Sequence, residues 1–148
     1  MATPTALDTL IELATKDSDA ATKHLGRSVR IRDEAQQKLD MLLQYRDEYA
    51  LRFEQNLASG LSATAYRNFQ LFIEKIDNVL AGQQEVVNLA QGRIDEAKTA
   101  WQACERKRLS YDTLATRAKN AAQAAANKRD QKQSDEQASR MTYYNKQN

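Results

Sequence analysis

Few side chains in this sequence have the type and spacing needed for catalysis. His24 is the only histidine and Cys104 the only cysteine, and they lie far apart in the chain. A general base or a nucleophile needs neighbours that orient and activate it, yet the sequence contains no metal-binding histidine pair, Cys-x-x-Cys, nucleophile elbow or phosphate-binding glycine loop. The carboxylates alternate with Lys and Arg, as on a solvated helical face. We therefore expect no catalytic residues, no metal, no cofactor and no enzymatic activity.

A short basic strip could bind nucleic acid or an anionic membrane surface. It consists of Lys23, His24, Arg27, Arg30 and Arg32. No aromatic residues are interleaved with it, and Asp33 and Glu34 follow at once. The net charge is only +2, from 22 basic and 20 acidic residues. A solvated helix face accounts for the strip more simply, and we keep nucleic-acid or membrane-surface binding as an alternative function.

A larger group of side chains is apolar and gathers on both sides of residue 60. Its members are Leu42, Leu43, Tyr45 and Tyr49 before that point, and Phe69, Phe72, Ile73, Ile76 and Val79 after it. Two helices can cover only the residues that face each other, so part of this group should be exposed. Exposed aromatic clusters favour partner binding. The alternative is a locally wider core, and the residues alone do not decide between the two.

Helices must position these side chains, because apolar residues recur every three or four positions in the second half of the chain. Within this series only Gln83, Arg108 and Arg129 are polar. The series is Phe69, Ile73, Ile76, Leu80, Gln83, Val87, Ala90, Ile94, Ala97, Trp101, Cys104, Arg108, Tyr111, Ala115, Ala118, Ala122, Ala125 and Arg129. A period of 3.5 residues predicts a coiled-coil seam that needs a partner helix along its length.

The first half of the chain offers that partner, although its seam is interrupted by Ser18, Ser28, Arg32 and Arg46. The series is Ile11, Ala14, Ser18, Ala21, Leu25, Ser28, Arg32, Ala35, Leu39, Leu42, Arg46, Tyr49, Phe53 and Asn56. Pro4 and a capping pair of Thr5 and Asp8 mark the start of a helix. Gly60 can close it in the left-handed conformation, and Ser62 or Thr64 can cap the next one.

The sequence thus predicts an all-α fold, a long two-helix antiparallel coiled-coil hairpin whose second helix is the longer. We expect one domain over residues 1–148, with helices over about 5–57 and 65–140, a turn over 58–64 and a polar tail over 141–148. Beyond about residue 115 the second helix has no partner in the chain. No segment suits a membrane span or a secretory signal, which favours a soluble, cytoplasmic protein.

Several motifs follow one another in a specific order. They are Tyr45-Arg46-Asp47-Glu48-Tyr49, Gly60 in the turn, Phe69-Gln70-Leu71-Phe72-Ile73 followed by Ile76, Trp101 with Lys107, Leu114 and Arg117, and a final segment from Asp130 to Ala138. Over nearly its whole length the chain resembles the FliJ family, a small coiled-coil component of the bacterial flagellar type III export apparatus. The related stalk of a virulence type III secretion system shares this architecture and stays open as an alternative.

The resemblance implies a non-catalytic stalk at the flagellar base, on the cytoplasmic side of the inner membrane. Its paired termini would insert into the hexameric flagellar export ATPase, and its turn end would face the cytoplasmic domain of the membrane export gate. Export chaperones would be further partners. Carried over by position, the gate-binding residues are Leu42, Tyr45, Tyr49, Phe72, Ile76 and Val79, bordered by Lys38 and Gln83. The ATPase-docking residues are Asp130, Lys132, Asp135 and Glu136.

Overall fold

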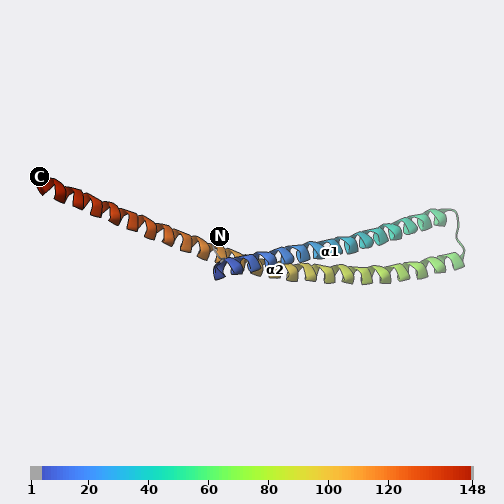
Figure 1. Cartoon of the computed structure of the whole chain (residues 1–148). Coiled ribbons are helices and arrows are strands. Elements are labelled where there is room, and N and C mark those ends of the chain that lie inside the picture. Colours follow the sequence, from blue (N-terminus) through green and yellow to red (C-terminus); the bar gives the residue numbers. More distant parts are fainter. Residues whose placement is uncertain (1–4, 148) are drawn as a thin grey trace. The chain divides into compact units, whose positions relative to one another are not determined.

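A computed structural model describes residues 5–147, and this part of the chain contains two α-helices. Helix α1 spans Ala6–Ala58 and helix α2 spans Ala63–Gln147, with a short turn between them (Figure 1). No strand occurs among the described residues. The predicted all-α class, with two packed helices of which the second is the longer, is confirmed.

The chain divides into two compact units. One consists of residues 18–103, which hold most of α1, the turn and the first half of α2. The other combines the start of α1 with residues 104–147 of α2. The antiparallel hairpin is complete within the first unit, because both helices and their turn belong to it.

Helix α1 begins at a reciprocal pair of hydrogen bonds. The backbone nitrogen of Thr5 donates to Asp8 Oδ2 at 3.1 Å, and the backbone nitrogen of Asp8 donates to Thr5 Oγ1 at 3.2 Å. This arrangement is a capping box in which aspartate takes the place of the usual glutamate, and it satisfies two backbone N–H groups at the helix start. The predicted pairing of Thr5 and Asp8 is confirmed, whereas Pro4 lies outside the described residues.

The turn between the helices depends on Gly60 and Ser62. Gly60 has a φ of 92°, in the left-handed region that favours glycine, and its backbone nitrogen donates to the Leu57 carbonyl at 3.2 Å. Ser62 Oγ accepts a hydrogen bond from the backbone nitrogen of Ala65 at 3.1 Å and so caps α2. Both predicted roles are confirmed, and the turn is shorter than expected because α2 already begins at Ala63.

The seam of the hairpin unit is narrow and is made largely of small side chains. Ala35, Leu39 and Val87 form its central cluster, with Leu80 packed against them. Ser28, Ala90 and Ala97 are also buried, at 3–7% exposure. No side chain in the described part of the chain is less than 2% exposed. Stability therefore comes from a long stripe of modest contacts, as the thin seam predicts.

The second unit shows where pairing between the helices ends. Ala14 is 4% exposed, and Cys104, Arg108, Tyr111 and Ala115 are partly buried. From residue 116 to 147 every residue is exposed except Ala126, which is partly buried. The seam positions after Ala115, which are Ala118, Ala122, Ala125 and Arg129, are all exposed. The prediction that the seam loses its intramolecular partner near residue 115 is confirmed.

The far end of α2 differs from the expected polar tail over residues 141–148. Residues 141–147 are helical, and the helix continues to Gln147. Neither glycine nor proline occurs after Gly92, so no residue interrupts the backbone hydrogen bonds. Local contacts also favour the helix, since Gln147 Nε2 donates to the Tyr143 hydroxyl at 3.0 Å. Asn148 lies outside the described residues.

Candidate interaction surfaces

Six aromatic rings from the two helices interdigitate next to the turn. In order, and alternating between α1 and α2, they are Tyr45, Phe72, Tyr49, Phe69, Phe53 and Tyr66. Ring centroids of successive neighbours are separated by 3.6–6.1 Å. Offset and edge-to-face ring pairs each add about 0.5–1.5 kcal/mol beyond the area they bury. We call these six residues the aromatic ladder.

The ladder contains three of the six residues predicted to bind the export gate, namely Tyr45, Tyr49 and Phe72. Tyr49 and Phe72 lie 4.1 Å apart between ring centroids, and Tyr45 contacts Phe72 edge-on at 6.1 Å. Tyr45 and Val79 are both 52% exposed. Ile76 is only 7% exposed and belongs to the seam, so its side chain supports this surface and does not form part of it. The cluster therefore widens the core and also leaves an exposed edge.

A groove of about 390 Å³ borders this exposed edge. Its lining residues are Lys38, Met41, Leu42, Tyr45 and Gln83. Met41 is 70% exposed and was missed by the sequence argument. Its position one residue before the seam residue Leu42 was the available signal, because a large apolar residue beside a seam lies at the rim of the helix pair. The groove joins Lys38 and Gln83, which border the predicted gate surface, to Leu42 and Tyr45.

Polar side chains at the interrupted seam positions bond across the helix pair. Arg46 Nε lies 2.6 Å from Asp77 Oδ1, and Arg32 Nη1 donates to Gln91 Oε1 at 2.9 Å. Gln83 Nε2 donates to the Ala35 carbonyl at 2.9 Å. The hydrogen bond to Asp77, with the charge of its carboxylate, raises the pKa of Arg46 above its ordinary value.

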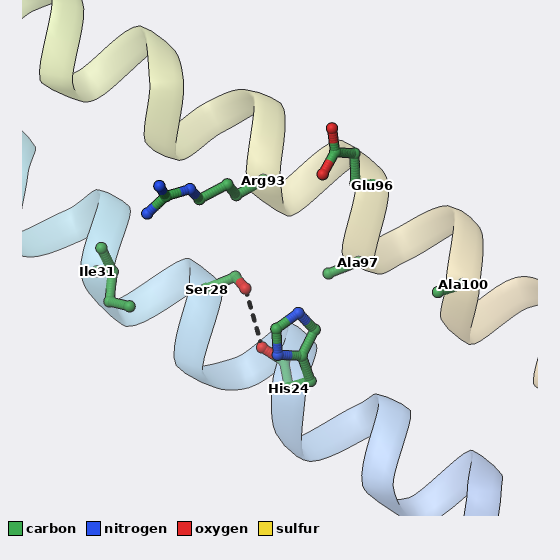
Figure 2. Close-up of a pocket in the computed structure, with 7 residues that line it drawn as sticks. All are labelled: His24, Ser28, Ile31, Arg93, Glu96, Ala97 and Ala100. Atoms are coloured by element: carbon green, nitrogen blue, oxygen red, sulfur yellow. Dashed lines mark hydrogen bonds between the residues drawn. The ribbon is translucent and has the colours of Figure 1, made fainter.

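The basic strip does not form one continuous surface. Arg32 turns toward the seam, where it bonds to Gln91 and to Asp33. Arg27 and Arg30 are exposed and line a shallow groove with Ile31 and Glu34. His24 lines a neighbouring groove of about 500 Å³ together with residues of α2 (Figure 2). The strip therefore divides between the seam and one flank of the hairpin.

The residues predicted to dock into the ATPase ring lie together on the exposed part of α2. They are Asp130, Lys132, Asp135 and Glu136, and all four are exposed. None of them takes part in an ion pair within the described residues. Their charges are therefore available to a partner, in contrast to Arg108, which bonds to Glu105 and Asp112 in the paired part of the same unit.

Metal-binding groups and membrane-spanning helices are both absent from the described part of the chain. Residues 5–147 contain no group of three or more His, Cys, Asp or Glu side chains that could hold a metal ion. Within the same residues, neither helix is apolar enough over a sufficient length to cross a membrane.

Comparison with known proteins decides the family. Residues 3–148 match the profile of a family described as "Flagellar FliJ protein". The chain belongs to the FliJ family. A flagellar FliJ protein of Escherichia coli strain K12 is 31% identical to it over 140 residues, which is 95% of each chain. A flagellar FliJ protein of Salmonella typhi is 32% identical over 142 residues, again 95% of each. Membership of the FliJ family supports a role in the flagellar export apparatus.

Proposed function

We propose that this FliJ-family chain is the non-enzymatic central stalk of the flagellar export ATPase. In this proposal the unpaired part of α2 inserts into the hexameric ring and promotes its assembly and activity. The hairpin next to the turn binds the cytoplasmic domain of the membrane export gate. The chain would thereby link the ATPase to the gate and to export chaperones carrying their substrates, at the cytoplasmic side of the flagellar base.

The observation that carries the ATPase part is the exposure of α2 from residue 116 to 147. In proteins most of the stability of a helix comes from packing of one face, and this part of α2 has almost no packed face among the described residues. Its alanine-rich start can approach another backbone closely, and Asp130, Lys132, Asp135 and Glu136 add unpaired charges further along. Small residues and charges on one long helix suit insertion into a narrow, polar channel.

The gate part of the proposal depends on the exposed edge of the aromatic ladder. Tyr45 and Val79 supply exposed apolar area, and Tyr49 and Phe72 fix the position of Tyr45 through ring contacts. Binding energy at protein interfaces is concentrated in a few such aromatic anchors held in place by their neighbours. Leu42 lies at the floor of the adjacent groove and completes the surface.

The ATPase part can be tested with purified components. The chain should stimulate ATP hydrolysis by the isolated export ATPase and should co-sediment with the assembled ring. The combined charge reversal Asp135→Lys and Glu136→Lys should weaken both effects without changing helicity. If the unmodified chain neither stimulates hydrolysis nor co-sediments, the stalk function is wrong.

The gate part requires a variant that removes exposed surface and keeps the inner ring contacts of the ladder, from Phe72 to Tyr66. Tyr45→Ala with Val79→Ser removes exposed apolar surface at two positions that are each half exposed. We expect this variant to lose binding to the cytoplasmic gate domain while its circular dichroism stays the same and its melting temperature falls by no more than a few degrees. A larger fall in melting temperature together with the loss of binding would show that both residues belong to the core.

The flagellar system is favoured over the virulence system by the relatives. Both relatives described above carry the name of a flagellar protein and match the chain over 95% of its length. A pull-down against the flagellar ATPase and a virulence-system ATPase in parallel would compare the two directly.

A further inference from the structure

The two flanks of the hairpin unit differ in character. On α2, the residues Gln70, Asp77, Gln84 and Gln91 recur every seven positions along one flank and are all polar. On the other flank the same spacing gives Phe72, Val79 and Val86, followed by Arg93. Residues seven apart lie on the same side of a helix, so α2 has one polar flank and one flank that is apolar from Phe72 to Val86. The bonds from Arg46 and Arg32 to Asp77 and Gln91 occupy the polar flank.

Exposed aliphatic side chains continue along the apolar flank well beyond the ladder. Val86 is 50% exposed and Leu89 is 61% exposed, and both lie on α2 within two turns of Arg93. On α1, Ile31 is 51% exposed and Met41 is 70% exposed. We call Ile31, Met41, Val86 and Leu89 the apolar flank.

Two grooves on this side of the hairpin are lined by residues of both helices, and they include Ile31 and Met41 of the apolar flank. The larger groove has a volume of about 500 Å³ and joins Ile31, His24 and Ser28 of α1 to Arg93, Ala97 and other residues of α2 (Figure 2). Its floor is made of small side chains, which leave space between the helices. The groove with Met41 and Gln83 lies further along the hairpin toward the turn. The two grooves lie on one side, because Ile31, Lys38 and Tyr45 are seven residues apart on α1.

Charged side chains border the flank, and most of them are basic. Arg27, Lys38 and Arg93 line its grooves, and Lys75 lies one turn before Val79. None of the four takes part in an ion pair within the described residues. Glu34 and Glu96 are the acidic residues that line the same grooves. The excess of unpaired basic groups favours an acidic occupant.

We infer that the apolar flank is the binding site for an acidic amphipathic helix of a partner protein. This third helix lies lengthwise along α1 and α2. Apolar residues of the partner would cover Ile31, Val86 and Leu89, and its carboxylates would meet Arg27, Lys38 and Arg93. Apolar positions repeat every seven residues along α2 at Phe72, Val79 and Val86, and Ile31 and Tyr45 lie on the same side of α1. This pattern matches another helix better than an extended peptide or a nucleic-acid strand. The surface goes beyond the proposed gate contact and adjoins it.

Binding can be measured with a synthetic peptide. The groove residues from His24 to Tyr45 span roughly 32 Å of helix, so a labelled peptide of about 21 residues matches the flank in length. Leucines in a heptad pattern with glutamates beside them give the required acidic amphipathic helix, and its negative charge opposes self-association. A peptide of the same composition in scrambled order is the control. We expect fluorescence anisotropy to show binding of the patterned peptide only.

Two pairs of substitutions test the assigned residues. Val86→Ser with Leu89→Ser should weaken peptide binding at least about tenfold, since exposed apolar anchors are removed. Lys38→Gln with Arg93→Gln should weaken it about three- to tenfold and reduce its dependence on salt. Leu51→Ser and Lys98→Gln are matched controls: Leu51 is 56% exposed, and neither residue lies on this flank. Tyr45 and Val79 remain unchanged in all four variants. Because Lys38 borders the predicted gate surface, Val86→Ser with Leu89→Ser is the pair whose failure is distinguishable from failure of gate binding.

Several results would overturn the inference. Equal binding of the patterned and scrambled peptides would do so, as would binding that neither substitution pair alters. Retention on heparin or on anionic vesicles that is lost in the Lys38→Gln, Arg93→Gln variant, without binding of the peptide, would instead assign the flank to a polyanion. A dimer detected by light scattering that dissociates on Val86→Ser with Leu89→Ser would assign it to a second copy of the chain.

Discussion

The glycines of this chain serve opposite roles, and their backbone conformations distinguish them. Gly60 adopts a φ of 92° at the turn, whereas Gly26, Gly82 and Gly92 lie inside helices. A Cβ atom added to any of the four would meet no other atom within 4 Å. Backbone conformation and not space therefore decides the effect of substitution.

We expect Gly26→Ala to stabilise the chain by about 0.5–1 kcal/mol, because alanine loses less backbone entropy in a helix. Gly60→Ala should instead destabilise it by about 1 kcal/mol, because an L-residue is strained at positive φ. Urea unfolding of both variants beside the unmodified chain measures the two effects. A stabilised Gly60→Ala variant would contradict the role given to the turn.

Arg46 and Asp77 give a second test at the level of single residues. Because the pKa of Arg46 is raised in the folded chain, its contribution is complete at every pH below the ordinary arginine value and is lost only as the pH rises through the folded value. The destabilisation caused by Arg46→Gln should therefore be the same at pH 6 and pH 9. It should shrink in high salt, because the pair is exposed to solvent. Thermal unfolding at both pH values and two salt concentrations provides the measurement.

At the level of elements, the seam was predictable because its period is a property of the sequence. The positions from Ile11 to Phe53 and from Phe69 to Ala115 are buried or partly buried, and only Asn56 departs at the end of α1, where it is exposed. The capping residues were predictable because capping is local: Thr5, Asp8 and Ser62 bond to backbone groups three positions away.

Contacts between residues distant in the sequence were not predictable. The seam positions Arg32 and Arg46 interrupt the apolar pattern, but nothing in the pattern identifies Gln91 and Asp77 as their partners. Ile76 was assigned to a binding surface, whereas its seam position accounts for its burial. A side chain at such a position cannot serve the core and the surface equally, and the packing of the helix pair decides whether it is buried or exposed.

The aromatic ladder should be the most stabilising element of the hairpin unit. Phe69 stacks on Phe53 with 3.6 Å between ring centroids and also contacts Tyr49 at 5.5 Å. We expect Phe69→Ala to cost about 2–3 kcal/mol, below the full core value because the ring is only partly buried. Tyr45→Ala, at the exposed end of the ladder, should cost about 1 kcal/mol or less. Equal losses in chemical unfolding would show that Tyr45 belongs to the core and not to a binding surface.

At the scale of the whole molecule, folding and the proposed docking to the ATPase depend on different parts of the chain. The buried and partly buried positions end at Ala115, apart from Ala126, while the docking charges lie beyond residue 129. A protein that must fold before its partner is present benefits from this separation, because the exposed part of α2 can be adapted to the partner without loss of the core.

This separation predicts the behaviour of a chain truncated after Ala118. Truncation removes residues 119–148, and residues 119–147 include no fully buried side chain. The melting temperature of the remainder should therefore stay within a few degrees of the original. The helical circular dichroism signal should fall by about a fifth, in proportion to the helix removed. Stimulation of the export ATPase should be lost, whereas binding to the gate domain should persist. If the truncated chain still stimulates the ATPase, the docking site lies in the paired part of the molecule. If it unfolds, the exposed end of α2 is needed for folding, which the burial pattern does not predict.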